Sequence, residues 1–175
     1  MVNEIREEKI DGADAAQWDA VEEATELLHE ERFYDALIFL REIIKGDSKN
    51  PYAFYFLGVA LYESGELDAA RDAYRACLGV APNHLGARVA LSHVLRELGD
   101  PRGAIREGMA ALALKPGDSD ALHAVGLAYM ARGETAAARK YLEAFLESKP
   151  EFEVATDVRA MLVELGDDPS TNTRN

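Results

Sequence analysis

The sequence has few of the features that mark disulfide-stabilised, membrane-spanning or secreted proteins. It holds a single cysteine, Cys77, among 175 residues, so no internal disulfide can form and a thiolate metal site lacks its partner ligands. It has no run of about 18 apolar residues, the length that a membrane-spanning helix needs. The stretch MVNEIREEKIDGADAAQ at the N-terminus lacks the apolar segment of a secretory signal. We therefore expect a cytoplasmic protein.

Positive charge is also scarce. Lysine and arginine together number 19 against 32 aspartates and glutamates, which gives a net charge of −13. Affinity for nucleic acids comes largely from basic side chains that neutralise phosphates. Attraction to anionic membranes has the same origin. The balance of charge therefore argues against both kinds of partner, and a protein partner is the expectation.

Known catalytic patterns are missing as well. The sequence contains no GxxxxGK[ST] phosphate loop, no GxGxxG, no HExxH and no GxSxG. Paired acids such as Glu7-Glu8, Glu22-Glu23 and Glu30-Glu31 are adjacent in sequence, so their carboxylates point to different parts of a helix surface. We predict no catalytic residue, no cofactor and no metal site, and hence a protein that is not an enzyme.

What the sequence does have is an internal repeat, and residues 51–84 are its clearest copy. There Phe54, Leu57, Gly58 and Leu61 have the spacing of one helical stripe, Gly65 marks a turn, and Ala70, Tyr74 and Cys77 form a second stripe. Steps of 34 residues, the length of this copy, lead to equivalent residues. Ala70 leads to Ala36, Ala104 and Ala138, and Pro82 leads to Pro116 and Pro150. Gly65 leads to Gly99 and Gly133, and Gly58 leads to Ser92 and Gly126. A fixed period of this length is typical of a solenoid.

The pattern resembles the tetratricopeptide repeat (TPR) family. The resemblance implies an all-α, right-handed TPR-type α-solenoid of four helix-turn-helix repeats with a C-terminal capping helix, nine helices in all. We assign repeats to 17–50, 51–84, 85–118 and 119–152, the capping helix to 153–165, and the whole solenoid to 17–166 as a single domain. Residues 1–16 are expected to be a polar extension, a frayed helix or a disordered lead, and residues 167–175 a disordered tail.

Several positions depart from the repeat pattern. Repeat one is the least regular: Glu31 replaces the turn glycine, and Ala20 and Glu23 replace large apolar residues. In repeat three, Gly108 occupies a position where an aromatic residue or leucine usually packs. Glycine in a helix interior costs about 0.5–1 kcal/mol against alanine. Gly108 is therefore either a weak point or a place of close backbone approach.

In TPR proteins the first helices of successive repeats line a concave groove, and the resemblance implies which positions face it. Several of these positions are large and apolar, which is typical of an interaction surface. Gly86 would leave a gap in the groove. The groove residues carried over are Trp18, Val21, Thr25, Leu28, Tyr52, Tyr55, Val59, Tyr62, Val89, His93, Arg96, Asp120, His123, Leu127 and Met130.

We therefore predict a non-enzymatic scaffold or adaptor that binds a partner peptide or protein segment in this groove. One alternative is that the tyrosines fold back on neighbouring repeats, or that the capping helix or the N-terminal segment fills the groove. Another is a structural subunit of a homo-oligomer, in which identical chains bury the apolar patches.

Two narrower resemblances bear on the partner. Residues 149–162, KPEFEVATDVRAML, and Phe56 to Gly58 resemble the class II chaperones of type III secretion systems, acidic TPR proteins that hold secreted translocators but have three repeats where this chain has four. Other TPR domains grip chaperone tails with a clamp of lysine, asparagine and arginine. We placed the clamp positions first on repeats one to three and then one repeat later. The first placement gives Val21, Thr25, Phe56, Gly86 and Ala90, and the second gives Tyr55, Val59, Ala90, Asp120 and Ala124. Neither set contains a lysine, asparagine or arginine, so a co-factor that binds chaperone tails is not expected.

Two histidines, His93 and His123, are expected to face each other across neighbouring helices, with Asp120 beside them. Zinc needs three or four ligands, so two exposed groove histidines are the simpler interpretation. If they serve a function, a pH-dependent partner contact fits better than catalysis, because histidine titrates near neutral pH.

Overall fold

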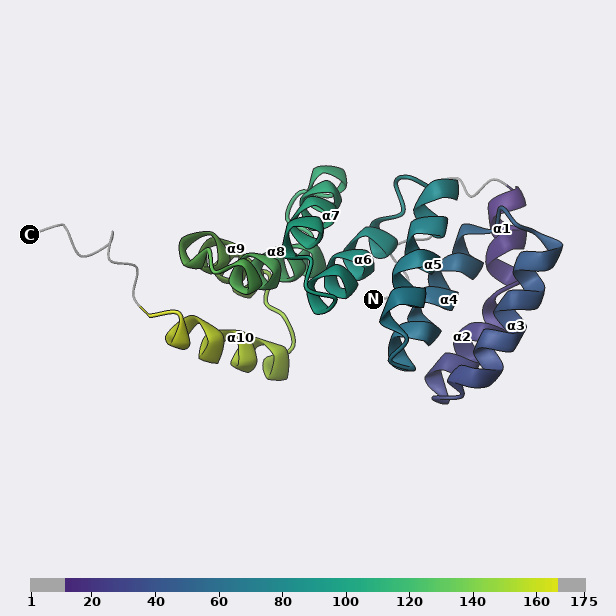
Figure 1. The fold of residues 1–175 in the computed structure, drawn as a ribbon, viewed down its shortest axis with the longest axis horizontal. Coiled ribbons are helices and arrows are strands. Elements are labelled where there is room, and N and C mark those ends of the chain that lie inside the picture. Colours follow the sequence, from purple (N-terminus) through teal and green to yellow (C-terminus); the bar gives the residue numbers. More distant parts are fainter. Residues whose placement is uncertain (1–11, 167–175) are drawn as a thin grey trace, which may run out of the picture. The chain divides into compact units, whose positions relative to one another are not determined.

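The structure, a computed structural model, describes residues 12–166 (Figure 1). This part of the chain forms ten α-helices and no strand. No helix in it combines the length and the apolar character that crossing a membrane requires. The helices are α1 (Gly12–Asp19), α2 (Glu22–His29), α3 (Phe33–Gly46), α4 (Pro51–Glu63), α5 (Leu67–Val80), α6 (Leu85–Glu97), α7 (Pro101–Leu114), α8 (Ser119–Arg132), α9 (Thr135–Glu147) and α10 (Phe152–Glu164).

The helices follow the predicted repeat order with one difference. Helices α2 and α3, α4 and α5, α6 and α7, and α8 and α9 are the four pairs, and α10 comes after them. The first half of repeat one, where the repeat pattern predicts a single helix, is instead divided into α1 and α2. The break lies at Ala20 and Val21, and Ala20 is one of the two positions that lack the usual large apolar residue. Helix α1 also begins earlier than expected, at Gly12, and it packs against α4.

The chain falls into two compact units that divide between Ala87 and Arg88, within the first turn of α6. We call these the N-terminal unit and the C-terminal unit and describe each by itself. The expected tail, residues 167–175, and residues 1–11 of the expected N-terminal extension lie outside the described part.

Three helices begin with the side-chain caps that their sequences suggest. Asn50 accepts a hydrogen bond from the backbone N–H of Ala53 at 3.0 Å, and Pro51 is the first residue of α4. Asp100 caps α7 in the same way, through the N–H of Gly103, and Asp118 caps α8 through that of Ala121. These caps satisfy backbone donors that the helix cannot satisfy itself, and Pro has no N–H to leave unpaired at the first position.

The turn inside each repeat has one geometry. In repeat two, Gly65 is left-handed with φ of 78°, its N–H donates to the carbonyl of Tyr62, and the N–H of Glu66 donates to that of Leu61. Gly99 and Gly133 repeat this conformation with φ of 79° and 80°. This is the Schellman motif, in which glycine normally takes the left-handed position.

Pairs of small and large residues hold the two helices of a repeat together. In the N-terminal unit, Gly58 of α4 faces the buried Tyr74 of α5, and a Cβ atom at Gly58 would lie 2.5 Å from the ring of Tyr74. In the C-terminal unit, Gly126 of α8 faces Leu142 of α9 with a similarly close approach of 2.6 Å. The glycines at this repeat position are therefore there for packing and not for flexibility.

Repeat three uses a different combination at the same two positions. Ser92 replaces the first-helix glycine and Gly108 replaces the large residue of the second helix. The buried hydroxyl of Ser92 donates to the carbonyl of Ala104 at 2.8 Å. A Cβ atom at Gly108 would lie 2.6 Å from Val125 and 3.2 Å from the hydroxyl oxygen of Ser92. Gly108 is therefore a place of close approach, but by side chains: the nearest backbone atom, N of Val125, would lie 3.6 Å from that Cβ atom.

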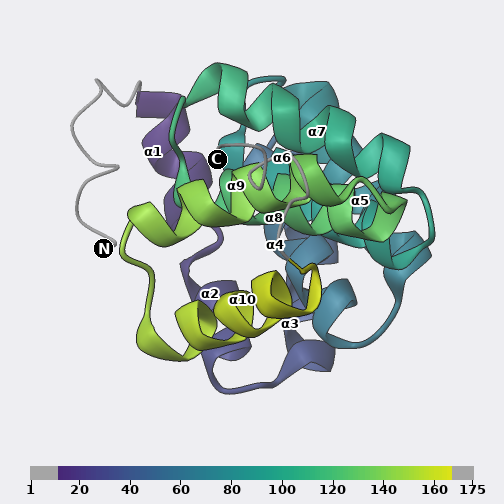
Figure 2. The same ribbon diagram turned by 90° about the vertical axis from the view of Figure 1, so that its left-hand side faces the viewer.

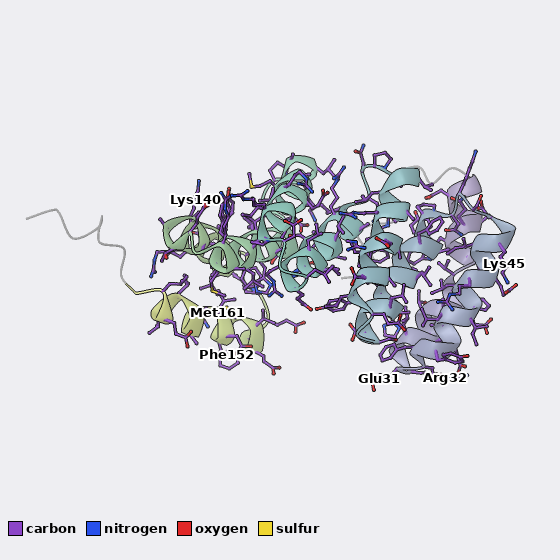
Figure 3. The ribbon with its side chains drawn as sticks, in the orientation of Figure 1. Glu31, Arg32, Lys45, Lys140, Phe152 and Met161 are labelled. Atoms are coloured by element: carbon purple, nitrogen blue, oxygen red, sulfur yellow. The ribbon has the colours of Figure 1, made fainter. Side chains whose placement is uncertain are left out.

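Helix α10 lies beside α9 and completes the C-terminal unit (Figure 2). Its Val158 is fully buried in a cluster with Leu127, Leu142 and Phe145, and Met161, Leu162 and Leu165 pack against that cluster. Phe152, on the first turn of α10, lies outside this cluster, and its side chain is 83% exposed (Figure 3). Phe152 and Val163, which is 80% exposed, are thus left uncovered.

Candidate functional site

The N-terminal unit contains an open hollow between the first helices of its two repeats. The hollow has a volume of about 420 Å³. Helix α2 and helix α4 form two of its sides, and the turn between α2 and α3 closes one end. The lining residues are Thr25, Leu28, His29, Glu31, Phe33, Tyr55, Phe56, Val59 and Glu63.

The floor of the hollow is apolar. Leu28, Phe33, Tyr55, Phe56 and Val59 are all half-buried, so each presents part of its surface to the hollow. The ring of Tyr55 packs edge-on against that of Phe56, with centroids 5.1 Å apart. These contacts fix the rings in place before anything binds, which lowers the entropy cost of binding.

Tyr55 is also held from its other side. Its ring lies 4.9 Å from the ring of His84, centroid to centroid. A Cβ atom at Gly86 would lie 3.4 Å from the same tyrosine ring. The ring of Tyr55 therefore lies against one side of the gap that we expected at Gly86.

The rim of the hollow is polar and acidic. Glu31 and Glu63 are exposed, while Nδ1 of His29 lies 2.8 Å from the carbonyl oxygen of Thr25. The hydroxyl of Thr25 donates to the carbonyl of Glu22 at 2.7 Å. The hydroxyl hydrogen of Thr25 and Nδ1 of His29 are thus engaged within their own helix, whereas the carboxylates of Glu31 and Glu63 lie on the rim.

An aromatic cluster continues from the floor toward α1. Trp18 packs edge-on against Tyr52 and Phe56, with ring centroids 5.2 and 6.0 Å apart. The hydroxyl of Tyr52 donates to Asp14 of α1 at 2.7 Å. Burial, and then this bond to a carboxylate, raise the pKa of Tyr52 to about 12. The N-terminal helix therefore takes up the polar tip of Tyr52, whereas Trp18 stays 43% exposed.

The structure places three of the predicted groove residues in the core. Val21 is fully buried, and Val89 and Leu127 are each 9% exposed. Leu127 is covered because Val158 of α10 packs in the same cluster, against which Met130 also lies. These buried side chains present almost no surface to a partner. Leu28, Tyr55 and Val59, together with Thr25 on the rim, are the predicted residues that meet in the hollow.

The C-terminal unit brings the two predicted histidines together. The rings of His93 and His123 lie 6.0 Å apart, and His123 stacks on Phe145 at 4.7 Å. Burial lowers the pKa of His93 to about 4, helped by His123 and Arg96 and opposed by Glu97. Burial also lowers the pKa of His123, against the effect of Asp120. Both rings are therefore neutral at pH 7 and partly packed away from water.

The surroundings of the histidine pair and of Cys77 bear on metal and thiol chemistry. No group of three or more potential metal ligands occurs in the part of the chain that the structure describes. Cys77 is buried, and burial raises the pKa of its thiol to about 12. A thiol in that environment is not a thiolate at neutral pH and is a poor nucleophile or ligand.

Comparison with known proteins agrees with this architecture. The family model described as tetratricopeptide repeat matches residues 21–84 and 89–151. The chain belongs to the tetratricopeptide repeat family. Its all-helical fold is that of a TPR solenoid, and TPR domains are modules of protein interaction. Among curated proteins, none matches the sequence significantly.

Solved structures of TPR proteins resemble the chain over most of its length. A crystal structure of MamA is 26% identical over 76% of this chain and 78% of the other, with a TM-score of 0.69. MamA from Desulfovibrio magneticus RS-1, from residue 41 to the end, is 18% identical and covers 94% and 99%, with a TM-score of 0.67. The first TPR of Spaghetti (RPAP3), bound to an HSP90 peptide, is 21% identical over 67% and 96%, with a TM-score of 0.61.

Sequence reasoning missed part of the TPR hollow. Phe33, Phe56, Glu31 and Glu63 line it, although none of them was among the predicted groove residues. Phe33 and Glu31 come from the turn that links the two helices of repeat one. That turn was marked in the sequence by its missing glycine, the one signal that could have drawn attention to it.

Proposed function

We propose that this TPR protein is a non-catalytic adaptor that binds a segment of another protein in the hollow between α2 and α4. The observation that carries the proposal is the hollow itself: an open space of about 420 Å³ with a floor of three aromatic and two aliphatic side chains. Its volume is within the range of about 300–1,000 Å³ that ligand sites occupy. Open apolar surface of this kind marks interaction sites.

The lining suits a protein ligand. Aromatic side chains supply large contact areas and are enriched among the residues that dominate binding energies. The hydroxyl hydrogen of Thr25 and Nδ1 of His29 are already bonded within α2. The floor offers apolar contact area and the rim offers charge, so the proposal is one of binding and contains no chemical step.

The comparison with Spaghetti (RPAP3) limits the class of ligand. That TPR is bound to an HSP90 peptide of sequence SRMEEVD, which carries three acidic side chains. Here the described lining of the hollow holds two glutamates and no lysine or arginine. An acidic peptide would meet like charge in this hollow, which is unfavourable. We therefore propose a different class of partner from the one in that complex.

A self-assembling subunit is the second candidate, and α10 supports it. Phe152 is 83% and Val163 80% exposed, and both lie on the helix that ends the described solenoid. A second copy of the chain could bury this apolar surface. The two candidates use different surfaces, so one set of variants separates them.

The test removes the apolar floor without touching the core. Peptides are selected from a random library displayed on phage, with the full-length chain as bait, and the affinity of one selected peptide is measured by fluorescence anisotropy. We expect Leu28→Ala with Val59→Ala to weaken binding by at least about tenfold, the size of one or two hot-spot truncations. The control, Tyr34→Ala with Ile38→Ala, removes exposed apolar side chains of α3 outside the hollow and leaves affinity unchanged.

Light scattering, which measures the oligomeric state, completes the test on these variants and on one further variant of α10. A folded floor variant that binds the peptide as tightly as the wild type contradicts the proposal. If the wild type selects no peptide and forms oligomers that Phe152→Ala with Val163→Ala breaks up, self-assembly replaces it.

A further inference from the structure

One residue at the end of the hollow adopts a left-handed backbone conformation that the other three repeats give to glycine. Glu31 is left-handed with φ of 57°, at the position that Gly65, Gly99 and Gly133 occupy in the other three repeats. Its turn makes the same bonds: the N–H of Glu31 donates to the carbonyl of Leu28, and that of Arg32 to the carbonyl of Leu27. The geometry is shared, and only the residue differs.

A side chain at this position is a cost for folding. A left-handed conformation is disfavoured by about 1–2 kcal/mol for residues that carry a Cβ atom. The three glycine turns show that the motif closes without a side chain, and a Cβ atom added at any of them would meet nothing within 4 Å. Packing therefore does not call for a glutamate here. Residues in such conformations are often found at binding sites, where the conformation serves a purpose.

Glu31 is exposed and lines the hollow. Figure 3 shows it at the turn between α2 and α3. Among the described residues it has no cationic partner, because the adjacent Arg32 pairs instead with Glu30 at 3.2 Å and Asp35 at 2.7 Å. Glu63 lines the same hollow from α4, also without a cationic partner in the described chain. The rim thus presents two uncompensated negative charges above an apolar floor.

Glu31 and Glu63 carry charge of the same sign on one rim. The other glutamates of the α2 region, Glu22, Glu23, Glu26 and Glu30, lie outside the hollow and line a separate depression together with Leu27 and Arg32. Charges of one sign around a hollow raise the local concentration of oppositely charged ligands and speed their association. Charge complementarity therefore selects a basic ligand, while the apolar floor selects one with a large apolar side chain.

We propose that the hollow between α2 and α4 binds a peptide segment in which a large apolar residue is flanked by lysine or arginine. The apolar side chain lies on Phe33, Phe56 and Val59, and the basic side chain pairs with Glu31 and Glu63. This inference rests on the function proposed above and adds the chemistry of the partner.

The test uses the same phage library and the peptide that it yields. We expect the selected sequences to be enriched in lysine and arginine next to an apolar residue. With that peptide as the probe, Glu31→Gln weakens binding about two- to fivefold, the effect of losing one solvent-exposed ion pair. Raising the salt concentration from about 50 to about 500 mM weakens binding to the wild type more than to Glu31→Gln.

A second substitution separates binding from folding. Glu31→Gly removes the same carboxylate and also relieves the backbone, so it weakens binding while the melting temperature rises. Lys149, the other left-handed non-glycine residue described, has φ of 58° and lies outside the hollow. The matched variant Lys149→Gly raises the melting temperature and leaves binding unchanged.

The outcomes distinguish the two proposals. If the selected peptides are neutral or acidic, or if Glu31→Gln binds them as tightly as the wild type, the basic partner is ruled out. If the basic partner is ruled out but Leu28→Ala with Val59→Ala weakens binding of the selected peptide, the hollow remains the binding site. If neither set of variants changes binding, both proposals fail.

Discussion

The N-terminal and C-terminal units are built from the same repeat, yet they treat the face of the first helices differently. In the N-terminal unit, Leu28, Tyr55 and Val59 meet around an open hollow. In the C-terminal unit, Leu127 has the repeat position of Val59 but is only 9% exposed, because it shares a cluster with Val158 of α10. The repeat register thus determines which helices pair, while the element that packs next to a face determines whether it stays open.

Inside the repeats, repeat three departs from the pairing that repeats two and four keep. Gly58 faces Tyr74 in one unit and Gly126 faces Leu142 in the other, so both units keep the small-to-large pairing. In repeat three, Ser92 is larger than the glycine at the equivalent position, and Gly108 is smaller than the tyrosine or leucine. Val125 of the next helix fills the space beside Gly108. A repeat array therefore tolerates a change at one position when a neighbour in contact with it compensates.

The largest expected effect comes from two leucines at one repeat position. Leu40 of α3 and Leu142 of α9 are both fully buried, one in each unit. We expect Leu40→Ala and Leu142→Ala each to lower the free energy of unfolding by about 2–5 kcal/mol. Urea denaturation measures the loss, and amide hydrogen exchange locates it.

If the units are separate packing entities, each leucine variant loses exchange protection mainly in its own unit. An equal loss of protection in both units from either variant would show that the array unfolds as one body, and the comparison of two units would not extend to stability.

The histidine pair is expected to make the C-terminal unit sensitive to acid. The pKa of His93 is lowered to about 4 in the folded state, from an ordinary value of 6.5, mainly because the ring is buried. The unfolded chain therefore binds a proton that the folded one does not. Above pH 6.5, His93 therefore does not lower the stability of the fold. As the pH falls toward 4, protonation of His93 in the unfolded chain lowers the free energy of unfolding by up to about 3 kcal/mol.

Urea denaturation at pH 7 and pH 5 tests this expectation. The wild type should lose stability between the two values, and His93→Gln should lose clearly less. Parallel losses in the two proteins would mean that the buried ring is not the source of the pH dependence.

A smaller effect is expected at the compensated pair. Gly108→Ala places a methyl group against Val125 and Ser92, so it should lower the free energy of unfolding by about 1–3 kcal/mol. The control is Gly79→Ala in α5, where a Cβ atom would meet nothing within 4 Å. There the better helix propensity of alanine should stabilise by up to about 1 kcal/mol. Thermal denaturation measures both changes, and a stabilised Gly108→Ala variant would contradict the close packing described.

Much of the fold could be predicted because several independent signals recur with the same period. Gly65, Gly99 and Gly133 all adopt the left-handed turn, and Asn50, Asp100 and Asp118 all cap helices. The capping helix was expected from residue 153 to residue 165, and α10 spans Phe152–Glu164. Local chemistry determines each of these features, so the sequence alone is sufficient to find them.

The site was harder to predict because burial depends on the neighbours of a helix. Val21 has the position of a groove residue but is fully buried beside the break between α1 and α2. Arg88 occupies a usually apolar position and instead pairs with Glu107 at 3.0 Å. The periodicity of one helix does not reveal such tertiary contacts, and these residues could not be placed without the structure.

The attachment of α10 has a consequence for engineering longer arrays. Arg139 of α9 donates to the carbonyls of Leu162 and Gly166 at the end of α10, so one guanidinium holds the last turn of the final helix. A repeat unit appended after α10 would find its docking surface on α9 already taken. A designer who wished to lengthen this protein should therefore insert whole repeat modules ahead of α8, and keep α9 with α10 as a fixed terminator.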